Sequence, residues 1–161
     1  MSAIADNLQA VHARISNAAA AVGRSPESVR LLAVSKTWPL ACVLDAAEAG
    51  QRAFGENYVQ EAQAKIGELA GMDLEWHLIG HLQSNKAELA AHLFDWVQTV
   101  DRHKLIGALS RYRPADRAPL NVLVQVNIDD EASKHGCRPA LWDGKAAERI
   151  VAKLDELLST K

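Results

Sequence analysis

Five short apolar segments recur along the chain at nearly regular intervals, and this recurrence constrains the fold more than any other feature. The segments begin near Arg30, Gln51, Glu75, Asp95 and Leu120. Stretches with helical periodicity lie between them, and a glycine such as Gly50 stands where a helix would end. Strand, helix and strand at this spacing indicate βα units and a parallel sheet.

Two architectures fit such a chain: a (β/α)8 barrel and an open, doubly wound sheet. Only about five strands are predicted, so a closed barrel would be incomplete. An apolar stripe predicts an extra helix over residues 3–22, and a second stripe predicts a helix over about 142–159. The length of 161 residues argues for one domain, 1–161.

Composition excludes several classes of function. The formal net charge is -2 and no basic block occurs, so there is no electrostatic case for nucleic acid or acidic membranes as partners. The two cysteines, Cys42 and Cys137, are far apart, which argues against a disulfide framework. No secretory signal or membrane-spanning apolar run is visible. We expect a cytoplasmic protein.

Lys36 stands directly after the apolar run Leu31–Val34 and Ser35, at the carboxyl end of the first predicted strand. Ligands bind at that end of the strands in parallel βα folds. A lysine amine is nucleophilic only when neutral, and its pKa in water is about 10.4. A partly desolvated position would lower that pKa and activate the amine. The alternative is that Lys36 simply leaves the strand into solvent.

Other polar residues follow the later strands. Asn57 comes just after Gly55, either as a ligand contact or as an ordinary turn before a helix. His77 and His81 are four apart, which on a helix would suggest a metal pair, but this segment is predicted as a strand and no metal site is expected. Gln125 could point into a barrel mouth or be satisfied by nearby backbone. No glycine-rich phosphate loop is present.

The order and spacing of these segments resemble the pyridoxal phosphate homeostasis family, whose members are similar to the N-terminal barrel of alanine racemase. The resemblance covers about residues 5–140. It is carried by five segments: Leu31–Lys36, Phe54–Glu61, Trp76–Lys86, Val122–Ile128 and Ser133–Gly136.

The resemblance implies an α/β, TIM-like barrel with an extra N-terminal helix. It implies that Lys36 holds pyridoxal 5'-phosphate as a Schiff base, with Val34, Asn57 and His77 around the cofactor ring. It implies no catalytic residues, because family members are regarded as cofactor carriers or regulators of vitamin B6 pools rather than as established enzymes.

The chain departs from the family in its C-terminal third. Family members continue through three more strands, which carry a Gly-Met-Ser-x-Asp and an Arg-Ile-Gly segment near the cofactor, and neither segment occurs here. Three explanations are open: a truncated or rearranged product, a half-barrel that pairs with another copy, or a different ending in which the helix 142–159 covers the open side. An unpaired edge strand tends to associate, so we favour self-association through the open barrel edge.

Three functions therefore compete. The first is a pyridoxal phosphate-binding protein of vitamin B6 homeostasis. The second is an amino-acid racemase-like enzyme that uses the same cofactor. The third is a truncated, non-catalytic member that oligomerises and binds the cofactor weakly.

Overall fold

The computed structural model describes residues 2–129 and 131–137. Contacts between residues group the chain into two compact units, 1–77 and 78–161, and each unit is considered by itself below. The prediction of a single domain stays a prediction. The helix predicted over about 142–159 lies outside the described residues.

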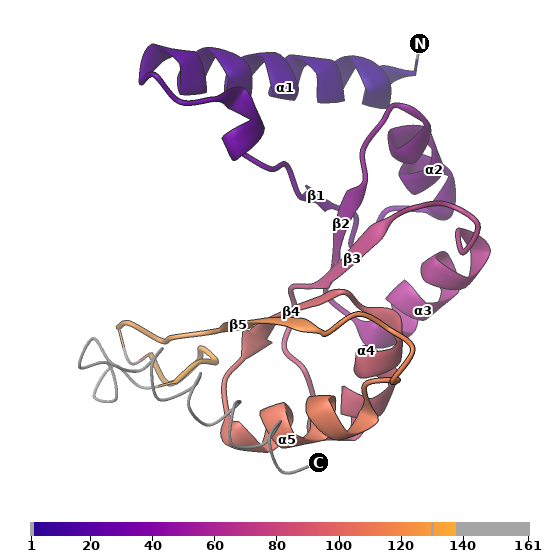
Figure 1. The fold of residues 1–161 in the computed structure, drawn as a ribbon, viewed down its shortest axis with the longest axis vertical. Coiled ribbons are helices and arrows are strands. Elements are labelled where there is room, and N and C mark those ends of the chain that lie inside the picture. Colours follow the sequence, from indigo (N-terminus) through magenta and orange to yellow (C-terminus); the bar gives the residue numbers. More distant parts are fainter. Residues whose placement is uncertain (1, 130, 138–161) are drawn as a thin grey trace. The chain divides into compact units, whose positions relative to one another are not determined.

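The first unit alternates helices with short strands (Figure 1). The middle strand, β2, pairs in parallel with β1, and β3 is its other neighbour in the sheet. The elements of this part of the chain are α1 (Ala3–Ala21), the 3-10 helix η1 (Pro26–Ser28), β1 (Ala33–Val34), α2 (Leu40–Glu48), β2 (Ala53–Glu56), α3 (Val59–Glu68) and β3 (Glu75–Leu78), whose last residue opens the second unit.

Local sequence explains where these helices begin and end. The Ser2 hydroxyl oxygen accepts the Ala5 N–H at 3.3 Å and so caps the start of α1. Pro39 immediately precedes α2, where a fixed φ suits the first turn. Gly50, just beyond α2, has a φ of 99°, a left-handed conformation that glycine adopts without strain. The helix predicted over residues 3–22 is confirmed to within one residue by α1.

The outer face of this sheet is packed against helices. Phe54 and Trp76 lie in contact on β2 and β3, with ring centroids 5.6 Å apart, and both are almost fully buried. Val43 of α2 and Ala62 of α3 are also buried. Burial of each large apolar side chain contributes roughly 1.5–3 kcal/mol, so this layer anchors the strands that carry the candidate site.

The second unit repeats the pattern. Strand β4 pairs in parallel with β5, with Trp96 opposite Asn121, and fully buried Leu82, Phe94 and Leu105 form its core. No described helix is long and apolar enough to cross a membrane. The elements of this unit are the 3-10 helix η2 (Ser84–Lys86), α4 (Ala87–Leu93), β4 (Trp96–Val100), α5 (His103–Tyr112) and β5 (Asn121–Val124).

The last strand differs from its prediction. The apolar, β-branched run over 120–128 is by itself typical of a strand buried on both faces, but β5 alternates between exposed Asn121 and Leu123 and half-buried Val122 and Val124. Leu123 is 46% exposed. Apolar content predicts a strand correctly, but burial depends on which faces other elements cover, and that depends on tertiary packing.

Candidate functional site

The register of the first three strands places three residues in one row across the sheet. Val34 of β1 lies opposite Gly55 of β2. The Glu75 N–H donates to the Arg52 carbonyl oxygen at 2.8 Å, and this parallel bond sets His77 of β3 opposite Gly55 on the other side. Residues paired in this way point to the same face of a sheet. Gly55, which stands between Val34 and His77, is buried and contributes no side chain to this face.

Lys36 and Asn57 follow this row at the carboxyl end of the strands. Asn57 lies two residues beyond Gly55, and the two-residue period of extended chain points it to the same face. Lys36 lies two residues beyond Val34, in a turn. The ladder continues past β1, because the Ser35 N–H donates to the Gly55 carbonyl oxygen at 2.9 Å. Val34, Asn57 and His77 thus belong to one face of the sheet, and Lys36 follows at the carboxyl end of β1. Their role as a cofactor site stays a prediction.

The four residues differ in burial. His77 is 6% exposed and Asn57 is half-buried. Lys36 is exposed, so of the two alternatives for this lysine the structure has exit into solvent and not a partly desolvated amine. The physical reason is that the chain turns away directly after Ser35, which carries the lysine beyond the packed layer.

A tight turn holds Lys36. It runs from Ser35 to Trp38 and is closed by the Trp38 N–H, which donates to the Ser35 carbonyl oxygen at 3.1 Å. The third residue of the turn, Thr37, has a φ of 65°, which a β-branched residue rarely adopts. Strained conformations of this kind tend to cluster at functional sites.

A buried ion pair on the opposite face fixes the start of that turn. The Ser35 hydroxyl donates to Glu56 Oε1 at 2.6 Å, and Lys65 Nζ of α3 lies 2.7 Å from the same oxygen. Lys65 Nζ also donates to the Ser35 carbonyl oxygen at 2.8 Å. Glu56 is fully buried and the Lys65 side chain is 11% exposed. These contacts hold the residue that precedes Lys36 against β2 and α3.

A second carboxylate orients His77. Glu75 Oε1 accepts from His77 Nε2 at 2.5 Å and from Arg30 Nη2 at 2.6 Å. Burial alone would raise the pKa of Glu75, but the hydrogen bonds and charges of Arg30 and His77 bring it below its ordinary value. The ionised carboxylate places a proton on Nε2 of His77 and fixes the plane of the ring.

Sequence reasoning missed Glu56 and Lys65. A usable signal exists, because Ser35 and Glu56 alternate with Lys36 and Asn57 and must face the helices. A charge on that face needs a partner, and Lys65 on the following helix is within reach.

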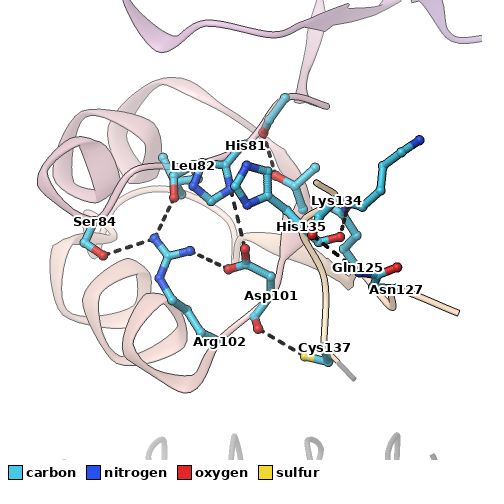
Figure 2. A network of polar contacts seen from close by, with 12 residues as sticks. His81, Leu82, Ser84, Asp101, Arg102, Gln125, Asn127, Lys134, His135 and Cys137 are labelled. Atoms are coloured by element: carbon cyan, nitrogen blue, oxygen red, sulfur yellow. Dashed lines mark hydrogen bonds and ion pairs between the residues drawn. The ribbon is translucent and has the colours of Figure 1, made fainter. Parts of the chain in front are cut away.

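Two alternatives were open for Gln125: its side chain could point into a barrel mouth or bond to nearby backbone. Gln125, and Asn127 two residues further on, bond to nearby backbone. Gln125 Nε2 donates to the His135 carbonyl oxygen at 2.9 Å, and Asn127 Nδ2 donates to the Glu131 carbonyl oxygen at 2.8 Å. Both amides thus hold the loop 131–137 of the second unit, as Figure 2 shows for Gln125. Cys42 and Cys137 are free cysteines.

Comparison with known proteins identifies the family. The model of the alanine racemase N-terminal domain matches residues 5–159. The pyridoxal phosphate homeostasis protein of Pseudomonas aeruginosa is 56% identical over 157 residues, which are 98% of this chain and 67% of that protein. The chain belongs to this family. The homeostasis protein of Escherichia coli is 52% identical over 160 residues, 98% of this chain and 68% of its own length.

A solved structure of a relative supports the same family. PipY of Synechococcus elongatus, determined with PLP bound, is 42% identical, with a TM-score of 0.68, over 87% of this chain and 64% of PipY. The resemblance predicted from sequence is confirmed, and so is the α/β fold of the alanine racemase N-terminal type, present as part of a barrel. The chain spans about two thirds of the length of these relatives.

Proposed function

We propose that this chain binds pyridoxal 5'-phosphate and serves vitamin B6 cofactor homeostasis, with Lys36 holding the cofactor as a Schiff base. The observation that supports the proposal is the common face of Val34, Asn57 and His77, with Lys36 at the carboxyl end of the neighbouring strand β1, and it is consistent with the names of the relatives. Pyridoxal phosphate is an aldehyde, and when bound it supplies an electron sink for amine chemistry.

The residues of this row fit such a group. A primary amine at the exposed end of β1 is accessible to an aldehyde. Gly55 puts no side chain between Val34 and His77, and Asn57 offers an amide that can donate and accept. His77 is buried and held by Glu75, so its ring forms a fixed wall rather than a mobile one.

The test is to add pyridoxal phosphate to the purified chain, follow the absorbance of the bound form, reduce with borohydride and map the modified residue. The expected result is label at Lys36 that disappears in Lys36→Ala. Lys104→Ala is the matched control, because Lys104 is exposed on α5 of the second unit and should keep the label at Lys36. Label spread evenly over surface lysines would contradict the proposal.

An amino-acid racemase activity stays an open prediction. Such an enzyme must remove the α-hydrogen of its substrate, which needs a positioned acid or base. Exchange of that hydrogen with deuterated solvent, followed by NMR on the cofactor-loaded chain, separates an enzyme from a carrier. A carrier shows no exchange above that of free pyridoxal phosphate.

We further propose that the protein works in the cytoplasm and that its partner is the small-molecule cofactor rather than nucleic acid or membrane. We also propose that copies of the chain self-associate through the sheet edge. The net charge of -2 and the free cysteines support the first statement. Exposed Leu123 of β5 and Ile128 beyond it support the second.

A further inference from the structure

Three ligand-type side chains meet in the second unit, away from the Lys36 row. His81 follows β3, Asp101 directly follows β4, and His135 lies in the loop beyond β5. One ligand atom from each lies within 4.8 Å of the other two. Figure 2 shows both imidazole rings beside the Asp101 carboxylate. Three segments far apart in sequence thus converge on one point.

The distance between His81 and Asp101 suits two ligands of one metal ion better than a direct hydrogen bond. His81 Nδ1 and Asp101 Oδ2 are 3.5 Å apart, which is long for a charge-assisted hydrogen bond. Two ligand atoms about 2.0–2.1 Å from a tetrahedral ion lie roughly 3.3–3.5 Å from each other. The gap between these two atoms therefore has the size that a shared cation would fill, and a ring nitrogen of His135 lies within 4.8 Å of both.

Outer contacts hold Asp101 in place. Its Oδ1 accepts from Arg102 Nη1 at 2.5 Å, and its side chain is 9% exposed. Arg102 Nη2 in turn donates to the Leu82 carbonyl oxygen at 2.9 Å and to Ser84 Oγ at 3.1 Å. Arg102 occupies one carboxylate oxygen and leaves Oδ2 facing His81. Supporting hydrogen bonds of this kind are what orient ligands in metal sites.

The loop that carries His135 is also fixed. Gln125 Nε2 binds the His135 carbonyl oxygen, and the next residue, Gly136, has a φ of 135°. A Cβ at Gly136 would lie 2.6 Å from the Asn127 backbone nitrogen, so only glycine allows this close approach. His135 is therefore placed beside His81 by backbone geometry.

The two rings stack with their centroids 3.6 Å apart and their planes 15° apart. A bound ion lies close to the plane of each ligating ring, so the rings must rotate away from the stack when it binds. His135 is exposed, and rotation about its side-chain bonds needs no repacking of the core.

We propose that His81, Asp101 and His135 form a binding site for one divalent transition-metal ion of the zinc type, with water completing the tetrahedron. Two imidazoles and one carboxylate are a common zinc ligand set, and imidazole nitrogen disfavours Mg²⁺ and Ca²⁺. The prediction of no metal site considered His81 only with His77. The partners that the fold supplies are instead more distant in sequence.

The test titrates Zn²⁺ into the untagged, metal-free chain in competition with a chromophoric chelator. We expect one Zn²⁺ per chain, and Co²⁺ in its place should show the intense visible absorption of a tetrahedral site. His135→Asn should weaken binding at least about tenfold, because even outer-shell changes weaken metal sites about 10–100-fold. His81→Asn should weaken it by a similar factor.

His12→Asn is the matched control, since His12 is an exposed histidine on α1 of the first unit. It should leave Zn²⁺ affinity unchanged. Far-UV circular dichroism checks that each variant is folded. If His81→Asn does not fold, His135→Asn alone decides the result. Absence of stoichiometric binding, or an equal loss in His12→Asn and His135→Asn, would overturn the site.

Discussion

At the scale of single residues, Thr37 is the clearest source of strain beside the candidate site. Its φ of 65° puts a β-branched side chain in the left-handed region. Asparagine tolerates this conformation better, so Thr37→Asn should stabilise the chain by about 1 kcal/mol. The urea unfolding midpoint measures the change. Thr37→Val is the control, because it keeps the branched Cβ and should gain nothing; a lower midpoint for Thr37→Asn would refute the argument.

Glu75 makes the stability of the folded chain depend on pH. Its pKa in the folded chain lies below the ordinary 4.5, since Arg30 and His77 outweigh the effect of burial. A lowered pKa means that the ionised carboxylate stabilises the fold; that contribution is present above about pH 4.5 and is lost as pH falls through the folded-state pKa. Glu75→Gln should therefore lower the free energy of unfolding at pH 7, and the loss should be smaller in acid. Glu68→Gln, an exposed carboxylate on α3, should show no such trend when both are followed by urea unfolding.

At the scale of elements, the buried pair Glu56–Lys65 connects β2 and α3 to the turn of Lys36. Lys65→Met leaves a fully buried carboxylate without its cation and should cost about 3–5 kcal/mol. The double variant Glu56→Gln with Lys65→Met should recover much of that loss, because neither charge remains buried. Urea unfolding measures both.

The same pair provides a test of function. Because Lys65 and Glu56 hold Ser35, the double variant should fold but label Lys36 with pyridoxal phosphate more slowly than the parent chain. Equal labelling rates would mean that the pair stabilises the fold without positioning Lys36.

Element types and approximate boundaries could be predicted because apolar periodicity and caps are local. The starts of β4 and β5 lie one residue from their predicted positions near Asp95 and Leu120. The exposed position of Lys36 is one of the two alternatives that the local sequence leaves open, and the direction in which the chain leaves β1 decides between them. The pairing of Glu56 with Lys65 has only a weak signal in the sequence, since it depends on strand register and on which helix covers which face.

At the scale of the whole molecule, we expect association between copies to depend on the apolar surface that β5 carries. Leu123 is 46% exposed and Ile128, shortly after the strand, is 78% exposed. Exposed apolar strands associate with further strands, and a lysine on such a strand prevents this. Leu123→Lys should therefore shift the chain toward monomer, as measured by light scattering over a range of protein concentrations. Val22→Lys is the control: Val22 is 70% exposed at the end of α1, so the change adds the same charge in the other unit and should leave association unchanged. A parent chain that is monomeric at every concentration, or an equal shift in both variants, would show that β5 is not the surface through which copies associate.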